Sequence, residues 1–440
     1  MELSLTTIGL IGIGIFLLTL FLGMNVGIVM LISGFLGIWM IRGWDAALYG
    51  MGFTVYRTAA SQFLVVLPLF ILMGMAAAQS GVSEDTFKTL NKWVGHFRGG
   101  LAMAAICACT IFGAVCGNVV ATSATLGKVA MPEMRKYKYA DELSSGTIAS
   151  GGNLGALVPP STAFIVYGFV TETPIGALFV AGILPAVLLT VVFMFQIYIQ
   201  CKLKPSLCEL APAATWKERV ISLKGLWGVT LVFAIAMGGI MAGYFTPVEA
   251  GAAGSTAMFI VGLINKKLTR KGSFRALLEA GKIAALIMLL IFGAMLFGSF
   301  LTLSEVTSDF SNYIISADMN RYVVMLIVLF FYWVMGTFMD PWALLIVSLP
   351  IFFPIVSHAG FDSLHFGVLC ALTVAIGNVS PPVGVTIFAL RGVCPDIPVS
   401  TIFRGCIPYM ITMTLFMAVS YTHLRCRRRR ECRSRWSPYH

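Results

Sequence analysis

Charged side chains are scarce in this chain, and their scarcity excludes a soluble protein. Only 11% of the 440 residues are Asp, Glu, Lys or Arg, whereas 58% are hydrophobic and the mean hydropathy is +0.89. A soluble domain carries about 25% charged residues. The composition therefore predicts an all-α polytopic membrane protein, because helices satisfy their own backbone hydrogen bonds in lipid.

The chain also lacks the motifs of several kinds of enzyme. It has no Walker A, HExxH, GxSxG or kinase-type sequence, and no aspartate-rich run that would bind a diphosphate with Mg²⁺. We therefore expect no catalytic residue and no cofactor. The ten cysteines are scattered and predicted to be small buried hydrophobes. A polytopic membrane enzyme stays open as a remote alternative, although it would need clustered intramembrane acids or histidines, which this sequence does not have.

Basic residues are concentrated in residues 421–440, which hold seven of the 30 Lys and Arg residues. A role in binding nucleic acid or lipid headgroups is one interpretation of such a run. We instead expect a non-native or disordered end, and no nucleic-acid partner, because the predicted topology places this tail on the side of the membrane that carries few cations.

Two stretches interrupt long apolar segments with glycine and a Pro-Pro pair. They are Ser150-Gly-Gly-Asn-Leu-Gly-Ala-Leu-Val-Pro-Pro-Ser161 and Ala375-Ile-Gly-Asn-Val-Ser-Pro-Pro-Val-Gly384. Proline removes a backbone donor and glycine weakens a helix, so both stretches predict broken helices. Broken helices at membrane depth must be buried in protein or line a cavity. Two of them at matching places in two halves indicate the binding site of a secondary transporter.

The two halves superpose with one shift of 222 positions, which pairs Pro132 with Pro354, Asn118 with Asp340, and Pro159-Pro160 with Pro381-Pro382. Each half is predicted to hold about five spans, one re-entrant hairpin and one broken helix. An odd number of crossings gives the second half the opposite polarity, so we expect an inverted repeat. The predicted parts are a first repeat at 1–200 with hairpin 99–134 and broken helix 141–171, a cytoplasmic linker at 201–224, and a second repeat at 225–420 with hairpin 322–354 and broken helix 365–391.

The distribution of cations predicts the orientation. Of the 23 Lys and Arg residues before the tail, 19 fall on one side of this topology. That side is predicted to be cytoplasmic by the positive-inside rule, which places both termini outside. The polar stretch Ser83–Arg98 is predicted to be an interfacial amphipathic helix with Ser83 as its N-cap.

The two hairpin tips and the two helix breaks form the candidate site. Exposed carbonyls and helix C-terminal ends coordinate cations, while helix N-termini attract carboxylates. Neutral oxygen ligands suit a hard cation such as Na⁺. The alternative is that Gly and Pro merely allow close helix packing. The tips and breaks supply these neutral polar side chains: Asn118, Thr122, Ser123, Asn153, Ser161, Thr337, Asn378 and Ser380.

Asp340 is the best charged candidate in the site. An acid at membrane depth is costly and marks a functional site by default. The alternative is that Asp340 caps the second arm of its hairpin, with Pro341 at the first helical position. Both interpretations stay open, and both can hold together.

At Cys116-Gly-Asn-Val-Val-Ala-Thr-Ser-Ala-Thr-Leu-Gly127, Ser150–Ser161, Phe338-Met-Asp-Pro341 and Ser380-Pro-Pro-Val-Gly384, the chain resembles the large membrane subunit of tripartite ATP-independent periplasmic (TRAP) transporters. The likeness covers about residues 5–420. It implies an elevator-type symporter of the bacterial cytoplasmic (inner) membrane that uses a Na⁺ gradient to import organic acids such as C4-dicarboxylates and sialic acid. It also implies a small four-helix membrane subunit and an extracytoplasmic substrate-binding protein as partners. A stand-alone sodium/anion symporter stays open as the alternative.

The resemblance also implies residue roles. Cation binding would fall on Gly117, Asn118, Thr122, Gly152, Asn153, Leu154, Gly336, Thr337, Asp340, Gly377, Asn378 and Val379. Substrate would lie between the two groups, at Ser123, Pro159, Pro160, Ser161, Ser380, Pro381 and Pro382.

Overall fold

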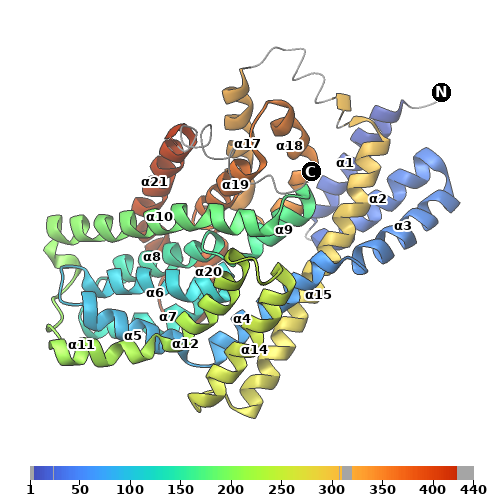
Figure 1. The fold of residues 1–440 in the computed structure, drawn as a ribbon. Helices are drawn as coiled ribbons and strands as arrows, with labels where there is room; N and C mark the ends of the chain where they lie inside the picture. Colours follow the sequence, from blue (N-terminus) through green and yellow to red (C-terminus); the bar gives the residue numbers. More distant parts are fainter. Residues whose placement is uncertain (1–3, 23, 307, 310–319, 424–440) are drawn as a thin grey trace.

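The computed structural model of the chain describes residues 4–22, 24–306, 308–309 and 320–423. Every regular element in these ranges is helical (Figure 1). Six of the described helices are long and apolar enough to cross a membrane, or seven if the bent pair Trp44–Ala59 and Leu64–Gln79 counts as one span. The predicted all-α membrane fold is confirmed. The basic tail lies outside the described residues from position 424 onward.

The first half of the chain runs from α1 to α10. Its helices are α1 (Leu5–Phe21), α2 (Val26–Arg42), α3 (Trp44–Ala59), α4 (Gln62–Gln79), α5 (Val82–Val94), α6 (Gly100–Cys116), α7 (Val119–Lys136), α8 (Asp141–Gly152), a 3-10 turn (Asn153–Ala156), α9 (Thr162–Thr171) and α10 (Ile175–Leu203).

A short helical linker comes next, with a 3-10 turn (Pro205–Leu207), α11 (Trp216–Ser222) and a 3-10 turn (Leu223–Gly225). The elements of the second half are α12 (Trp227–Phe233), a π-helical turn (Ala234–Gly238), α13 (Gly239–Met241), α14 (Pro247–Ile264), α15 (Arg270–Leu303), α17 (Arg321–Gly336), α18 (Pro341–His358), α19 (Ser363–Gly377), α20 (Val385–Val393) and α21 (Val399–His423).

The element order of α6–α10 recurs in α17–α21. In each set, two helices flank a tight connection, a helix ends before a Pro-Pro pair, a short helix resumes after it, and a long helix closes the half. Both Pro-Pro peptide bonds are cis. Figure 1 shows α1, α2 and α3 gathered at one side of the molecule, apart from these helices, with α15 beside them.

Close backbone approach at glycine holds both groups of helices together. A Cβ on Gly293 of α15 would lie 2.5 Å from the carbonyl oxygen of Gly27 in α2. A Cβ on Gly146 of α8 would lie 2.2 Å from the backbone of Gly405 in α21. Small residues of this kind let membrane helices pack backbone to backbone, where dispersion contacts replace the hydrophobic effect.

Two local expectations need correction, at α5 and α3. Helix α5 begins at Val82, and its N-cap is Gly81 in a left-handed conformation (φ +69°), so Ser83 lies inside the first turn. The predicted linker 201–224 contains helix α11, whose N-terminus is capped by a reciprocal capping box between Thr215 and Glu218. Helix α3 was not predicted, because its glycines and polar residues dilute the apolar signal.

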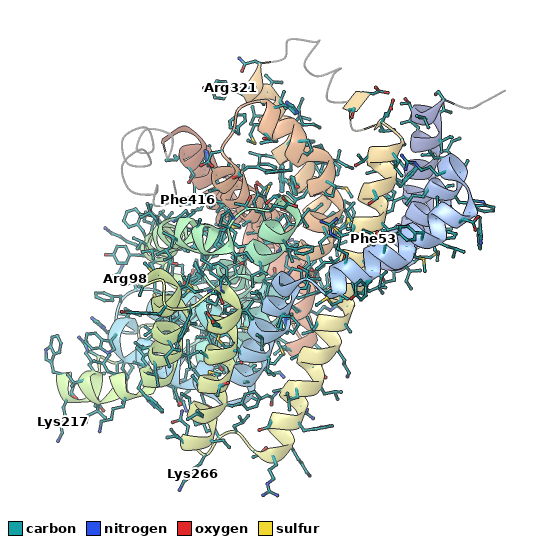
Figure 2. All side chains as sticks on the ribbon, turned by 45° about the vertical axis from the view of Figure 1, so that its right-hand side comes forward. Phe53, Arg98, Lys217, Lys266, Arg321 and Phe416 are labelled. Atoms are coloured by element: carbon teal, nitrogen blue, oxygen red, sulfur yellow. The ribbon has the colours of Figure 1, made fainter. Side chains whose placement is uncertain are left out.

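Cations gather at one end of the molecule. Figure 2 shows Lys217 and Lys266 at the end opposite Arg321. Arg135 at the end of α7 pairs there with Asp141, at 2.8 Å, and with Asp396, at 2.6 Å. This guanidinium holds the pKa of Asp396 below its ordinary value.

Candidate functional site

The first helix break lies fully inside the protein. Helix α8 ends at Gly152, and α9 begins only at Thr162, after Pro159 and Pro160. Every residue of 150–162 is buried. The freed backbone groups find local partners, as when the Ser161 hydroxyl donates to the carbonyl of Ala156 at 2.5 Å. The break is thus a packed structure rather than a loose loop.

The first hairpin tip is a two-residue connection between α6 and α7. Gly117 adopts φ +59°, where a side chain would be strained, and its N–H donates to the Gly113 carbonyl at 2.8 Å. Asn118 follows as N-cap of α7, and its side-chain oxygen accepts from the N–H of Ala121 at 3.0 Å. Gly117 and Asn118 together reverse the chain within two residues.

The first tip docks against the first break. The Gly117 carbonyl accepts from both the N–H of Thr162, at 3.3 Å, and its hydroxyl, at 2.7 Å. A Cβ on Gly152 would fall 1.8 Å from the Ser123 hydroxyl oxygen, so these residues touch. Thr122 donates to the Asn118 carbonyl at 2.7 Å. The structure therefore brings together most of the first group of candidate residues.

The second tip joins α17 to α18 and lies against the second break. A Cβ on Gly377 would lie 2.7 Å from the carbonyl carbon of Gly336. The Thr337 carbonyl accepts from the N–H of Gly384 at 3.1 Å. A hydrogen bond also spans the second break, since the Thr386 hydroxyl donates to the Asn378 carbonyl at 2.9 Å.

Two hydrogen bonds join the two halves at this place. The Asn378 amide donates to the side-chain oxygen of Asn153 at 3.2 Å, which connects the two breaks. The Trp342 indole donates to the Thr162 hydroxyl at 3.0 Å, which connects the second tip to the first break. Neither Trp342 nor Thr162 was a sequence candidate. Their positions next to Asp340 and Ser161 were the available signal.

A small pocket lies where these contacts meet, and three helix N-termini surround it. Its lining includes the first residues of α7, α9 and α18 and the caps of α7 and α18. The lining residues are Gly117, Asn118, Val119, Val120, Ala156, Thr162, Ala163, Asp340, Pro341 and Trp342. N–H groups and positive helix dipoles converge on this pocket.

Asp340 caps helix α18 and also lines the pocket, while its role in cation binding stays a prediction. Its carboxylate accepts from the N–H of Trp342 at 3.1 Å, and Pro341 occupies the first helical position, so the capping interpretation is confirmed. The same half-buried side chain lines the pocket together with Asn118, its counterpart at the shift of 222. Asp340 thus faces the first tip, whereas Gly336 and Thr337 contact the second break.

The residues assigned to substrate do not form one surface. Ser123 is buried, and its hydroxyl has no hydrogen-bond partner among the described residues. Pro159 lines a different, apolar cavity with residues of α6, α10 and α12. Ser380 is buried and accepts from the Trp333 indole at 3.0 Å, while Pro381 and Pro382 are exposed.

No three His, Cys, Asp or Glu side chains gather into a metal-binding group within the described ranges. The oxygens that the tips and breaks supply are carbonyls, hydroxyls, amides and one carboxylate. Two of these buried oxygens, the Ser123 Oγ and the Asn378 Oδ1, accept or donate no hydrogen bond in this part of the chain. Such a donor set fits a hard monovalent cation better than a transition metal.

Comparisons with known proteins agree with this architecture. Residues 13–423 match the family model described as the tripartite ATP-independent periplasmic transporter, DctM component. The chain is 32% identical over 367 residues to the C4-dicarboxylate TRAP transporter large permease protein DctM of Pseudomonas aeruginosa, covering 83% of this chain and 85% of that protein.

Two further relatives carry other substrates in their names. The sialic acid TRAP transporter large permease protein SiaM of Vibrio cholerae is 32% identical, covering 81% of this chain and 83% of that protein. The ectoine/5-hydroxyectoine TRAP transporter large permease protein UehC of Ruegeria pomeroyi is 30% identical, covering 90% and 92%. The solved structure of the Alcanivorax borkumensis YdaH transporter superposes with a TM-score of 0.65 at 13% identity, covering 86% and 88%, and shares the fold.

Proposed function

This chain belongs to the DctM family, the large permease subunits of TRAP transporters, and from this premise we propose that it couples inward transport of organic acids to a Na⁺ gradient by an elevator movement. It is a multi-pass inner-membrane transporter subunit and not an enzyme. The family implies a binding-protein-dependent secondary transporter with a small membrane subunit and a substrate-binding protein. Na⁺ as the coupling ion, an organic acid as the substrate and the elevator movement are what we propose.

The observation that carries the proposal is the convergence of three helix N-termini on one pocket beside Asp340. Helix N-termini attract carboxylates through their free N–H groups and their dipole. A carboxylate substrate next to Asp340 would place two negative charges close together in a low dielectric. A cation bound at the tips would offset this repulsion, so substrate and Na⁺ would bind together.

The candidate cation ligands are oxygens that the tips and breaks hold in place. In the first unit these are Asn118, Thr122 and the buried Asn153, and the Ser123 hydroxyl is available next to them. In the second unit they are Thr337, Asn378 and Asp340. When bound, Na⁺ would supply positive charge at this pocket. Two of the pocket's lining residues, one from each half, are joined by the Trp342–Thr162 hydrogen bond.

The organic-acid class rests on the relatives. Their printed names include C4-dicarboxylate, sialic acid and ectoine substrates. We propose an anionic organic acid of the C4-dicarboxylate or sugar-acid type, because the pocket is lined by helix N-termini, which favour a carboxylate. We also propose that the small subunit is a separate chain. One relative is instead named as a combined permease protein, DctMQ.

Membrane orientation and movement complete the proposal. The basic end that carries Lys217 and Lys266 would face the cytoplasm, with both termini outside. The two halves would then form an inverted repeat. Helices α6–α9 and α17–α20 would move as one transport unit against α1–α4 and α12–α15.

Uptake into proteoliposomes tests the proposal. The vesicles contain this chain and its small subunit, and uptake of labelled organic acids is measured with and without the binding protein and an inward Na⁺ gradient. We expect uptake only when both are present. Na⁺-driven uptake without binding protein would favour a stand-alone symporter. Uptake that does not depend on Na⁺ would exclude Na⁺ as the coupling ion.

A further inference from the structure

A second cavity lies outside the tip pocket, between α6, the first break, α10 and α12. Its volume is about 250 Å³ and its walls are apolar. Ala114 comes from α6, Pro159 from the break, Ile183 and Val187 from α10, and Phe233 from α12. In Figure 1, α6 lies between α10 and α12, and both helices contact it.

The cavity offers almost nothing to a polar ligand. Two of its twelve lining residues carry a hydroxyl, Thr110 and Thr230. The Thr110 hydroxyl is already engaged, since it donates to the Ile106 carbonyl at 3.0 Å and bonds to Thr190 at 2.9 Å. An organic acid therefore has no anchor here, whereas a hydrocarbon chain fits the lining.

The cavity adjoins an exposed apolar surface of α10. Val187 is 52% exposed, and Leu184 and Val191 beside it on α10 are 47% and 56% exposed. On α12, a surface groove shares Leu226 and Thr230 with the cavity. Cavity and groove together, which we name the α12 channel, follow the 3-10 turn Leu223–Gly225 and α12 as far as Phe233.

A cation lies at one end of the α12 channel. Lys224 is exposed and falls between Leu223 and Leu226, which both line the groove. This end precedes α12 and follows α11, which carries Lys217 at the basic end of the molecule (Figure 2). The α12 channel therefore has a positive charge at one end and an apolar cavity at the other. A phospholipid has the matching arrangement, with a phosphate at one end and acyl chains at the other.

We propose that the α12 channel binds a membrane phospholipid, with one acyl chain in the cavity against Pro159 and the headgroup phosphate at Lys224. An empty apolar cavity at membrane depth loses the dispersion contacts of its walls, and the surrounding bilayer supplies the chain that restores them. The site itself does not depend on the transport function. Its consequence does: a lipid held between the first break and α12 lies between the proposed moving and fixed parts.

Photolabelling in the membrane tests the site without measuring transport. The chain and its small subunit are reconstituted with phosphatidylglycerol that carries a diazirine in one acyl chain, and labelled peptides are mapped after illumination. We expect labels on the peptides that contain Ile183, Val229 and Phe233. Thr230→Trp, at an exposed position that lines both cavity and groove, should abolish those labels.

A matched substitution on the same surface separates the site from general contact with lipid. Val191→Trp also adds an indole to an exposed position, on α10 but outside the cavity lining, and should leave the labels unchanged. Equal labelling of all lipid-facing helices, insensitive to Thr230→Trp, would overturn the proposal. So would labels that appear only when the small subunit is left out, because the α12 channel would then be a protein interface.

The headgroup position has its own comparison. Lys224→Gln should weaken labelling by the phosphatidylglycerol probe but not by a diacylglycerol probe that has no phosphate. Lys217→Gln removes an exposed cation on α11, farther along the chain from the groove residues Leu223 and Leu226, and as the control it should change neither. Equal labelling of wild type and Lys224→Gln by phosphatidylglycerol would overturn the placement of the phosphate.

Discussion

The two tip-and-break units share one order of elements but differ in how they are enclosed. In the first unit, Pro159 and Pro160 are buried, as is every residue around them from 150 to 162. In the second, Pro381 and Pro382 are exposed and Phe338 is 56% exposed. The sequence repeat therefore sets the local backbone, while neighbours such as α10 and α12, which cover the first unit, set how tightly each unit is packed.

The largest difference between the units should appear at their glycines. Gly117→Ala would place a Cβ 2.6 Å from the Pro160 carbonyl at φ +59°, so we expect loss of uptake and of correctly folded protein. The left-handed conformation alone costs about 1–2 kcal/mol for a residue with a side chain. Gly336→Ala, in the second unit, meets its nearest atom at 3.4 Å, an ordinary contact, and should be tolerated.

Thermal unfolding of the purified variants, together with uptake, measures this prediction. Gly392→Ala, where a Cβ meets nothing within 4 Å, is the control for helix propensity. Equal effects of Gly117→Ala and Gly336→Ala would show that the two units are packed alike, contrary to the structure.

Asparagine at position 340 would make the two tips chemically alike. Asp340→Asn keeps a capping side chain but removes the carboxylate, as Asn118 does naturally in the first tip. We expect loss of Na⁺-dependent uptake with unchanged membrane insertion and stability. Asp340→Ala should lose uptake too, and in addition about 1 kcal/mol of stability with the cap.

Initial uptake rates over a range of Na⁺ concentrations check the effect of both substitutions. If the Asn variant keeps the wild-type Na⁺ dependence, Asp340 serves only as a helix cap. Asn118→Ala is the corresponding change in the first tip, and it separates loss of a cap from loss of a charge.

A smaller effect is expected where the two units touch. Trp342→Phe removes the indole donor to Thr162 but keeps an aromatic ring. One hydrogen bond contributes about 1 kcal/mol, so the Na⁺ concentration for half-maximal uptake should rise about fivefold. Trp333→Phe, which removes a hydrogen bond within the second unit, serves as the comparison. The same shift in both variants would mean that the contact between the units has no special role.

The smallest effect concerns the ion pair between Arg135, at the end of the first hairpin, and Asp396, in the connection between α20 and α21. The pKa of Asp396 is lowered by the Arg135 guanidinium. A carboxyl whose folded pKa lies below its unfolded value stabilises the protein above that unfolded value, about 4, and loses this contribution as pH falls through the lowered pKa. Asp396→Asn should therefore lower Tm slightly at pH 7, and the difference in Tm should be smaller at pH 3.

Screening by solvent keeps this contribution small, because the Asp396 side chain is 56% exposed. Scanning calorimetry or tryptophan fluorescence at the two pH values measures it. A Tm difference that persists unchanged at pH 3 would show that the substitution acts through something other than the carboxylate charge.

Much of this architecture could be predicted from the sequence, because it depends on the chemistry of local residues. Glycine and Pro-Pro pairs disrupt helices wherever they occur, so a break before Ser161 followed from the residues themselves. The same holds for Asp340 as a helix cap before Pro341. Helix α3 was not predicted, because mixed glycine, threonine and aromatic residues give no clear apolar periodicity over Trp44–Ala59.

The amino-acid sequence by itself determined the membrane class, the repeated order of hairpin and break, and the positions where the helices stop. These follow from composition, backbone chemistry and a shift within one chain. Only the tertiary structure decided that Asp340 faces Asn118 across one pocket, that Trp342 reaches Thr162, and that Pro159 points to an apolar cavity while Pro381 is exposed. Contacts between residues about 180 or more positions apart depend on how helices pack, and local propensity carries no information about them.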